Sequence, residues 1–368
     1  MRLLLVANAR FPTEWAHGVQ IARMAAAFAA LGHEVEVVVP DRPDRSPGEA
    51  NAFYGLPPTF RVRRLPDLGG PMGSTPQRLA FASAVAAHVA RARPDLVLSR
   101  DEVAAALAAP WARTLVEVHK FPTRRLGLYG ALVRRAHGVI STNAWKRDVL
   151  VRSHRVAAHR VRVCPNGADV AGIQATPPRP GIRAELGLAA EARLVLYSGH
   201  LHAWKGVETL VQAAPLLPDP AHVLLLGGRD KDVARFRREH QGPRVAVLGR
   251  VPHAEVAGWL RAADVLVLPN VAGSAESLRE TSPLKLLEYM ASGRPIVASD
   301  LPSVRELLDD DSAMLVRPDD PAALAAGIAL TLREPQAAAA RAARALHAVA
   351  AHDWSARAGA ILAFAGEC

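Results

Sequence analysis

The chain has 368 residues, of which 50% are hydrophobic and 5% aromatic, and it carries two cysteines and a net charge of +10. This length predicts two domains. Two cysteines are too few for a disulfide framework or a thiolate metal site, so we expect a cytoplasmic setting. No apolar run of about eighteen residues is free of charge, which argues against a transmembrane helix.

The excess positive charge lies in the first half of the chain. Residues 1–170 hold 24 Lys and Arg against 13 Asp and Glu, whereas residues 171–368 hold 21 against 22. This pattern is typical of a surface that faces anions, such as a membrane or an anionic lipid-linked acceptor, and an ordinary solvated surface is the alternative. Nucleic acid is not an expected partner, because no stacking platform of aromatic residues accompanies the basic ones.

One segment of this half combines charge with apolar groups. Leu126, Leu128 and Tyr129 lie close in sequence to four arginines, namely Arg124, Arg125, Arg134 and Arg135. Apolar side chains in such a setting can enter a membrane interface while the arginines meet anionic headgroups. Residues 69–73 add a glycine-rich loop. Peripheral association with the inner face of a membrane is therefore one interpretation of this half.

The first half begins with an expected strand over residues 3–8. We interpret this run as a buried strand and not as a signal peptide, because it is short and Arg10 and Pro12 follow it. A helix over residues 19–31 and a strand over residues 35–40 are expected next. Further strands are expected at residues 96–98, 114–118, 139–141 and 161–164.

The second half repeats this scheme. A strand is expected over residues 193–199, a helix over 207–217, and more strands at residues 223–227, 245–248, 265–268 and 296–298. Apolar runs separated by helices are typical of parallel sheets covered on both faces. Residues 177–181, rich in Pro, form the expected linker between domains over 1–172 and 182–352. The predicted fold class is α/β, with two Rossmann-like domains that face each other across a cleft.

Open α/β sheets bind ligands beyond the carboxyl ends of their strands, so the loops there hold the candidate residues. Between the last two predicted strands, Ser282 is a good N-cap, and Pro283 and Leu284 suit the first helical positions. The unpaired N–H groups of such a helix start bind phosphate well. Glu280 precedes the helix and Glu288 is its sixth residue, ~8 Å along the axis, so their carboxylates can accept hydrogen bonds from the hydroxyls of a nucleotide sugar.

The spacing of Glu280 and Glu288, followed by Tyr-Met-Ala-Ser-Gly-Arg-Pro-Ile-Val-Ala at residues 289–298, resembles the donor signature of family 4 of the retaining glycosyltransferases. The resemblance extends from the first strand to the last helix. It implies the two-domain GT-B fold, in which the first domain binds the acceptor and the second binds the nucleotide sugar. It also implies that a final helix near residues 353–368 packs back on the first domain, that Glu288 holds the ribose, and that Glu280 holds the transferred sugar.

Lys205 is the expected cation of the donor site. The sequence Gly199-His200-Leu201-His202-Ala203-Trp204-Lys205-Gly206 follows a predicted strand and places Lys205 beside a helix start, where a pyrophosphate would lie. Members of the family often have Gly-Arg-Leu here, and both the arginine and the lysine hold the diphosphate. His200 occupies the arginine position and has an ordinary pKa near 6.5, so Lys205 is the stronger cation. An exposed lysine at a helix start is the structural alternative.

His119 is the candidate catalytic residue of the first half. The sequence Glu117-Val118-His119-Lys120-Phe121-Pro122 ends a predicted strand and resembles the family's Glu-x-His-Asp-x-Pro motif, with Lys120 in place of the aspartate. In the family this histidine lies near the donor sugar and the acceptor, where an imidazole binds a hydroxyl or stabilises charge in the transition state. A purely structural histidine is the alternative.

Three further residues complete the expected donor site. Gly18 precedes the first long helix and lets its backbone approach a phosphate or sugar closely, although many relatives have two glycines at this place. Gly249-Arg250-Val251-Pro252 resembles the loop whose backbone contacts the nucleotide base, and Arg250 and Val251 are its candidate residues.

No metal or other cofactor is expected. Neither a His-Glu-x-x-His motif nor paired aspartates accompany the histidines at positions 17, 119, 200 and 202. The resemblance therefore implies a metal-independent retaining glycosyltransferase, which moves a sugar from a nucleotide diphosphate sugar to a glycan, a lipid-linked sugar or a small molecule by electrostatic and positional catalysis. A sugar-nucleotide epimerase of similar fold and a non-catalytic anion-binding protein are the alternatives left open, as is the choice between UDP and GDP.

Overall fold

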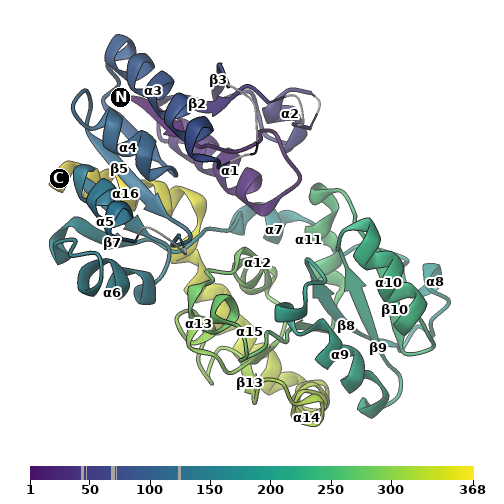
Figure 1. Ribbon diagram of the computed structural model, residues 1–368. Coiled ribbons are helices and arrows are strands. Elements are labelled where there is room, and N and C mark those ends of the chain that lie inside the picture. The colour runs from purple at the N-terminus through teal and green to yellow at the C-terminus, as the bar shows by residue number, and fades with distance from the viewer. Residues whose placement is uncertain (43–44, 47, 68–70, 72, 123–125) are drawn as a thin grey trace. The chain divides into compact units, whose positions relative to one another are not determined.

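The computed structural model describes residues 1–42, 45–46, 48–67, 71, 73–122 and 126–368. The chain divides into two compact units (Figure 1). The first unit comprises Met1–Gly167 together with Trp354–Cys368, and the second comprises Ala168–Asp353. Each unit is built on a parallel sheet with helices on its faces, so the predicted α/β fold class with two Rossmann-like domains is confirmed.

The first unit contains, in its described residues, a seven-stranded parallel sheet in the order β3-β2-β1-β4-β5-β6-β7. Its strands are β1 (Arg2–Val6), β2 (Glu34–Pro40), β3 (Arg61–Leu65), β4 (Leu96–Ser99), β5 (Thr114–Val118), β6 (Gly138–Ser141) and β7 (Val161–Val163). Its α-helices are α1 (Ala16–Ala30), α2 (Ala50–Phe53), α3 (Thr75–Ala92), α4 (Glu102–Ala108), α5 (Leu126–Arg135), α6 (Ala144–Arg152) and α16 (Trp354–Glu367). The strand order reverses between β1 and β4, and such a switch point is where open sheets bind ligands.

The second unit contains a six-stranded parallel sheet in the order β10-β9-β8-β11-β12-β13. Its strands are β8 (Arg193–Ser198), β9 (Ala221–Leu226), β10 (Val245–Gly249), β11 (Val265–Leu268), β12 (Ile296–Ser299) and β13 (Met314–Val316). Its α-helices are α7 (Val170–Ala175), α8 (Ile182–Glu185), α9 (Val207–Ala213), α10 (Asp230–His240), α11 (His253–Ala262), α12 (Leu284–Ser292), α13 (Pro302–Arg305), α14 (Pro321–Arg333) and α15 (Pro335–Val349). The switch point here lies between β8 and β11.

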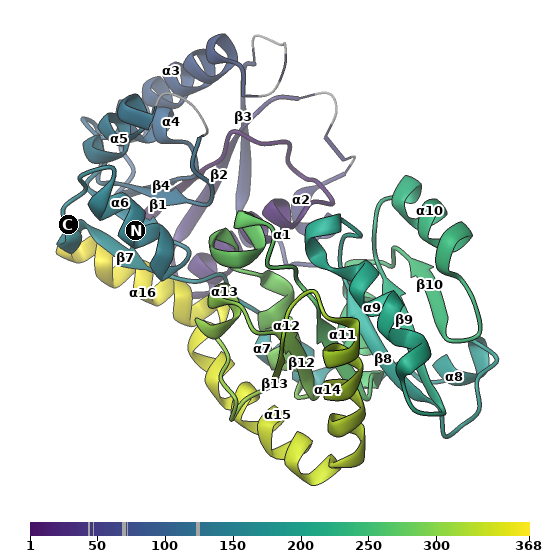
Figure 2. The same cartoon turned by 60° about the horizontal axis from the view of Figure 1, so that its bottom comes forward.

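The chain returns to the first unit through α16. This helix, yellow in Figure 2, packs against α1 within the first unit. The Arg113 Nη1 donates a hydrogen bond to the carbonyl oxygen of Ala365 at 2.8 Å, and Ile361 and Phe364 are fully buried. The last helix is therefore an integral part of the first unit's core.

The boundary between the units falls before α7, not at the Pro-rich segment 177–181. Ile173 of α7 is buried in the core of the second unit, where α7 packs against α12. Arg179 then lies with its guanidinium 4.9 Å from the ring centroid of Trp259 and also bonds to Glu185. These contacts make residues 168–181 part of the second unit.

Two strands, β3 and β13, were not predicted from the sequence, and the structure shows why. Both β3 and β13 lie at the edges of their sheets, and β3 alternates exposed basic residues with partly buried apolar ones. β3 therefore lacks the continuous apolar run that marks the buried strands, and β13 is apolar but only three residues long. The helix expected over 207–217 ends at Ala213 and continues as a 3₁₀ turn over Ala214–Leu216, which contains Pro215.

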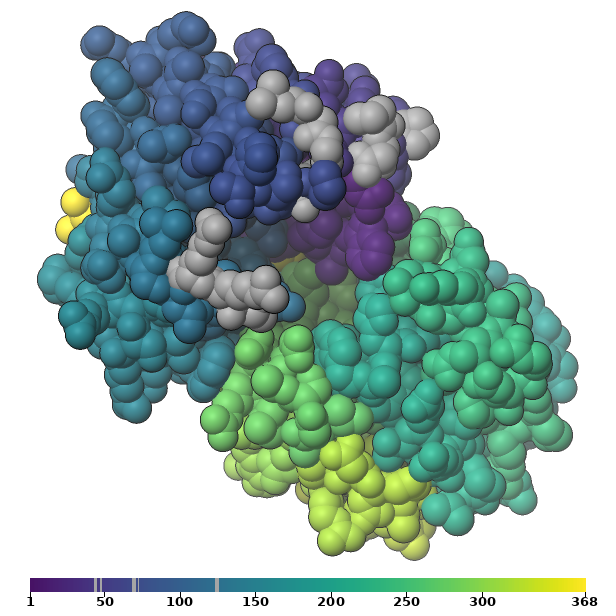
Figure 3. Space-filling model, in the orientation of Figure 1, coloured from purple at the N-terminus to yellow at the C-terminus, as the bar shows by residue number. Residues whose placement is uncertain are grey.

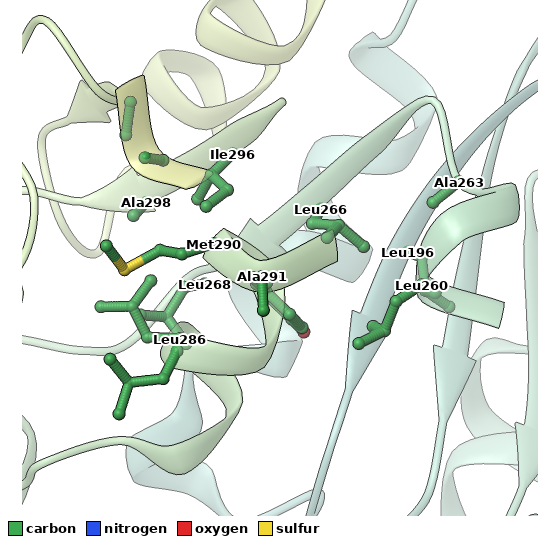
Figure 4. Close-up of a cluster of buried hydrophobic side chains, with 14 of the residues drawn as sticks. Leu196, Leu260, Ala263, Leu266, Leu268, Leu286, Met290, Ala291, Ile296 and Ala298 are labelled. Carbon is green, nitrogen blue, oxygen red and sulfur yellow. The ribbon is translucent and has the colours of Figure 1, made fainter. Parts of the chain in front are cut away.

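A buried apolar cluster fixes α12 in the second unit (Figure 4). Leu286 and Met290 project from one face of the helix towards Leu268, Ile296 and Ala298 of the adjoining strands. All five side chains are at most 3% exposed, and full burial of a Leu, Ile or Met side chain contributes roughly 1.5–3 kcal/mol. This packing places the start of α12 at the carboxyl ends of the strands.

No helix in the described part of the chain is both long enough and apolar enough to cross a membrane.

Candidate functional site

The loop after β8 begins with a glycine that lets a lysine lie against the backbone. Gly199 has a φ of +144°, and its N–H donates to the Leu226 carbonyl at 2.8 Å. A Cβ added at Gly199 would lie 2.0 Å from the Nζ of Lys285 and 2.7 Å from its Cε. Glycine is therefore required here both by the backbone conformation and by the close approach of the ammonium group.

Lys205 is buried at this loop, as the last residue of a 3₁₀ turn over Ala203–Lys205. Its side chain is 8% exposed, and its Nζ lies 3.7 Å from the ring centroid of Trp204. Burial lowers the pKa of Lys205 to about 7. Among the described residues its ammonium group has no hydrogen-bond acceptor or carboxylate partner. Lys205 is thus not the exposed helix-start lysine of the structural alternative.

Lys285, in the first turn of α12, supplies a second amine that the sequence did not single out. Its Nζ donates a hydrogen bond to the Tyr197 hydroxyl at 2.9 Å and lies 4.2 Å from that ring's centroid. The side chain as a whole keeps some exposure, but its amine end is enclosed by protein. This enclosure lowers the pKa of Lys285 well below its ordinary range, and the positive charge of Lys205 lowers it further.

The environment of His200 is electropositive. Burial is the main cause that lowers the pKa of His200 to about 4, and the positive charges of His202, Lys285, Lys205 and Arg250 all act in the same direction. His200 is therefore neutral at pH 7, and the basic groups that act on it with lasting charge are Lys205, Lys285 and Arg250. The rings of His200 and His202 are stacked, with centroids 5.3 Å apart. A cluster of amines and a guanidinium at the switch point of a sheet suits an anionic ligand.

The predicted helix start is correct within one residue. The N-cap is Pro283 and not Ser282, and no side chain caps the helix, so Leu284 is the first helical residue. A proline has no side-chain acceptor for the first N–H groups of the helix. The Leu286 N–H already donates to the Pro283 carbonyl at 3.0 Å, so the N–H groups of Leu284 and Lys285 are the ones that can be offered to a ligand. The helix ends before Gly293, which has a φ of +67°.

The two predicted carboxylates flank this helix start. Glu280 ends a π-helical turn over Glu276–Glu280, and Glu288 is the fifth residue of α12. Both side chains are half-buried. The π-helical turn carried no signal in the sequence, and such turns occur frequently at functional sites. Tyr289 holds the helix to β8, since its hydroxyl accepts a hydrogen bond from the Ser198 N–H at 2.8 Å.

The loop after β10 contributes one charged and one apolar residue. Arg250 is exposed, and its charge acts on His200. Val251 packs against the buried core of the second unit. The Gly227 N–H donates to the Gly249 carbonyl at 2.6 Å, which joins the loops after β9 and β10. The expected contact between this backbone and a base stays a prediction.

In the first unit, His119 lies beside a buried ion pair. Its Nε2 lies 2.7 Å from Oε1 of Glu117, a residue of β5 whose side chain is 1% exposed. The same oxygen lies 2.8 Å from Nη2 of Arg357 on α16 and accepts a hydrogen bond from Gln20 Nε2 at 2.9 Å. A buried carboxylate needs such partners, because an uncompensated charge in the interior is strongly unfavourable.

The network fixes the protonation state of His119. Burial and the positive charge of Arg100 lower the pKa of His119 to about 4, although Glu117 acts in the opposite direction. The charges of Arg357 and His119 hold the pKa of Glu117 far below its usual range in spite of burial. At pH 7 His119 is thus a neutral imidazole beside a carboxylate. Nε2 lies close to the carboxylate without forming an aligned hydrogen bond to it, so the carboxylate favours a proton on Nε2 through its charge and leaves Nδ1 as an acceptor for a hydroxyl.

Arg357 is the partner that the sequence analysis missed. It lies on an apolar face of α16 with Trp354, Ala358 and Ile361, and an arginine among buried positions at helical spacing is the signal that could have indicated a buried ion pair. Its Nε donates to the Pro165 carbonyl at 2.6 Å.

Gly18 lies within the first turn of α1, because this helix begins at Ala16 and not at residue 19. A Cβ at Gly18 would lie 2.2 Å from the Tyr54 hydroxyl, which donates to the Thr13 carbonyl at 2.8 Å. Packing therefore explains why a glycine occupies this position, because a side chain there would collide with Tyr54. Burial and Arg100 lower the pKa of the neighbouring His17 to about 4, so it too is neutral at pH 7.

Within the described ranges, no three His, Cys, Asp or Glu side chains are grouped so as to hold a metal ion. Metal independence stays a prediction.

Two parallel-sheet units, one of them with basic side chains gathered at its switch point, define a two-domain α/β protein with a candidate anion site. Two family models match the chain in succession: residues 17–171 match "Glycosyltransferase Family 4" and residues 192–334 match "Glycosyl transferases group 1". The chain belongs to this family of glycosyltransferases, and it is an enzyme of that class.

Curated relatives agree with this assignment. The chain is 30% identical over 357 residues to the phosphatidyl-myo-inositol mannosyltransferase of Mycobacterium leprae, an alignment that covers 92% of this chain and 90% of that protein. It is also 30% identical over 246 residues to the D-inositol 3-phosphate glycosyltransferase of Xylanimonas cellulosilytica, over 63% of this chain and 57% of that protein.

Solved structures show the GT-B fold. The sucrose-phosphate synthase of Thermosynechococcus elongatus is similar with a TM-score of 0.78 and 23% identity, over 100% of this chain and 98% of that one. The Anabaena protein HepE in complex with UDP is similar with a TM-score of 0.76 and 18% identity, over the whole of both chains.

Proposed function

We propose that this enzyme transfers a sugar from a nucleotide diphosphate sugar to an acceptor with retention of the anomeric configuration. The observation that carries the proposal is the pair of amines, Lys205 and Lys285, enclosed at the switch point of the second unit without a carboxylate partner among the described residues. A diphosphate supplies the missing negative charge, and the start of α12 adds N–H donors. The Anabaena relative's complex with UDP supports a nucleoside diphosphate as the donor's leaving group.

The donor roles follow from the positions along α12. Glu288 accepts hydrogen bonds from the ribose and Glu280 from the transferred sugar, while Ser282, Pro283 and Leu284 present the helix start to the diphosphate. These contacts hold the leaving group and stabilise the charge that develops on it. The cations replace a divalent metal in this role, so the transfer needs none.

His119 contributes as a neutral, oriented imidazole. Its Nδ1 accepts a hydrogen bond from a sugar hydroxyl, and the charge of the anchored Glu117 carboxylate, 2.7 Å from Nε2, favours the tautomer in which Nδ1 is the acceptor. None of the described residues assigned to the site above serves as a nucleophile, and we propose a front-face route in which the departing phosphate oxygen takes the acceptor proton.

We further propose a lipid-linked acceptor and peripheral association of a cytoplasmic protein with an anionic membrane. The face of the first unit formed by α3, α4 and α5, which appears in blue and teal in Figure 3, carries large exposed apolar side chains at Leu79, Leu107, Trp111, Leu126 and Leu128. Arg134 and Arg135 are exposed on the last turn of α5. The name of the Mycobacterium leprae relative, a phosphatidyl-myo-inositol mannosyltransferase, supports a lipid acceptor.

The structure limits the predicted membrane segment in two ways. Tyr129 is 5% exposed and packs against Phe121 and His154, so it belongs to the core and not to the surface. Arg124 and Arg125, with most of the 69–73 loop, lie outside the described residues.

Vesicle sedimentation tests the membrane proposal. Each arginine near an anionic surface contributes about 1 kcal/mol, so replacing Arg134 and Arg135 with glutamine is expected to weaken binding about 30-fold. The matched control replaces Arg237 and Arg238, an adjacent pair on the last turn of α10 in the second unit. Equal binding to neutral and anionic vesicles, or equal losses in the two double variants, would overturn the membrane proposal.

A thermal-shift screen tests the donor proposal. UDP, GDP and their sugars are added to the full chain, and a ligand present at a hundred times its Kd stabilises the fold by about 2.7 kcal/mol. We expect stabilisation by the nucleoside diphosphate and its sugar and none by the free nucleoside at the same concentration. No shift with any nucleotide sugar would contradict the proposal.

A further inference from the structure

Lys285 lies at the donor site, and the roles given above name it only as one of two enclosed amines, without assigning it a contact. It sits in the first turn of α12, directly over the backbone of Gly199. We propose that Lys285 is a second diphosphate-binding residue, which acts with Lys205 on the leaving group of the donor. The inference rests on the proposed function, because it requires a donor that carries a diphosphate.

The first argument is the charge balance around the two lysines. Lys285 has no carboxylate at ion-pair distance among the described residues, and the nearest polar group is the hydroxyl of Tyr197. Two like charges close together in a partly desolvated place disfavour each other. The arrangement is stable with both amines protonated only when an anion of at least equal charge lies between or beside them, as a diphosphate does.

The second argument is the geometry that holds the amine in place. Tyr197 accepts the hydrogen bond from Lys285 Nζ and donates its own proton to the His200 carbonyl at 2.6 Å. The hydroxyl is thereby fixed as an acceptor that holds the amine at the carboxyl end of β8. Gly199 provides the space, since any Cβ there would collide with the amine. The amine therefore lies beside the loop that carries Lys205 and beside the free N–H groups of α12.

The third argument concerns the proton. The groups that act on Lys285 are Tyr197 from β8, Lys205 from the 3₁₀ turn, and Glu288 within α12, and Glu288 alone favours the protonated form. Enclosure and the charge of Lys205 lower the pKa of Lys285 well below its ordinary range, and a bound diphosphate acts in the opposite direction. Any proton that the unliganded amine has lost is therefore taken up again when the donor binds.

Calorimetric titration of the full chain tests this inference. UDP, GDP and inorganic pyrophosphate are titrated at pH 8, where their phosphates are ionised, in two buffers with different ionisation enthalpies that together report the protons taken up. In the Lys285→Met variant we expect the diphosphate to bind about 10- to 100-fold more weakly, because a hydrogen bond to a charged group is lost. Fewer protons are taken up than in the wild type.

Two further variants separate charge from packing. Lys285→Gln keeps a donor for the Tyr197 hydroxyl but removes the charge, and it is expected to lose as much affinity as Lys285→Met. Lys231→Met removes an exposed lysine from α10 in the same unit, and its affinity is expected to equal that of the wild type. Melting temperatures of all variants identify any that fail to fold. If Lys285→Met does not fold, the affinity of Lys285→Gln for the diphosphate tests the inference.

The outcomes distinguish this inference from the proposed function. If the wild type binds a diphosphate but both Lys285 variants bind it equally well with unchanged proton uptake, the role of Lys285 is refuted and the donor proposal stands. If the wild type binds neither the nucleotides nor pyrophosphate, the donor proposal fails, and the inference fails with it.

Discussion

Replacing Lys205 with methionine is expected to stabilise the unliganded protein while it weakens nucleotide binding. Lys205 is 8% exposed and has no carboxylate partner among the described residues, so its charge is held in the fold at a cost that only a ligand offsets. Methionine has a similar length and no charge, and it fills the same space beside Trp204.

The magnitude follows from the pKa. Lys205 has a pKa of about 7 in the fold against 10.5 in its ordinary range, so at pH 7 it is charged in the unfolded chain and about half-charged in the folded one. At ~1.36 kcal/mol per pH unit this difference amounts to about 4 kcal/mol, and the contact with the Trp204 ring offsets about 1 kcal/mol of it. We therefore expect a stabilisation of about 2–4 kcal/mol, or a rise in Tm of about 5–15 °C.

The sign of the pH dependence makes the prediction specific. Between pH 7 and 10.5 the unfolded chain binds more protons at this lysine than the folded chain does, so the wild type gains stability as the pH rises through this window. The advantage of Lys205→Met is therefore largest at pH 7 and below and vanishes near pH 10.5. Differential scanning calorimetry of both proteins from pH 6.5 to 10 measures it. A destabilised variant, or an advantage that does not change with pH, would refute the reasoning.

Other variants test the remaining assignments. Glu288→Ala is expected to weaken nucleotide binding about tenfold in calorimetric titration, whereas His119→Ala is expected to slow transfer about 100-fold with little change in that affinity; the reverse pattern would exchange their roles. Chelation with EDTA should leave initial rates unchanged, and restoration by a divalent ion after a loss would disprove metal independence. Gly199→Ala, which forces a Cβ against an amine at a φ of +144°, should lower the free energy of unfolding by about 1–3 kcal/mol in urea titration. Arg357→Met should cost about 3–5 kcal/mol by leaving the Glu117 carboxylate buried and unpaired, and added Glu117→Gln should recover part of that loss; an additive double variant would contradict the ion-pair account.

The buried strands were predictable because their apolar runs are continuous. Val265–Leu268 and Thr114–Val118 appear in the structure with the predicted bounds, since a strand covered on both faces contains little but apolar residues. Of the strands that were missed, Arg61–Leu65 alternates exposed basic residues with partly buried ones, and Met314–Val316 is only three residues long. The unit boundary was misplaced because proline-rich composition marks a loop but does not show which core the loop packs against.

Candidate site residues could be predicted where they belong to a local sequence motif. They could not be predicted where only the folding of the chain brings them together. Lys205 and the start of α12 could be predicted from local sequence. The approach of Lys285 to Gly199 depends on residues far apart in the chain, as does the contact between Arg357 and Glu117. Pairings of this kind depend on how the sheet and its helices pack, and no local pattern encodes them.

Release of nucleoside diphosphate from a nucleotide sugar tests the central claim most directly. The full chain is incubated with UDP- and GDP-sugars, with and without acceptor lipids, and the freed diphosphate is measured beside a Lys205→Met/Lys285→Met control. We predict release from at least one donor by the wild type, strong reduction in the double variant, and a product whose anomeric configuration matches that of the donor. Release from no donor, or equal release by the folded double variant, would contradict the account.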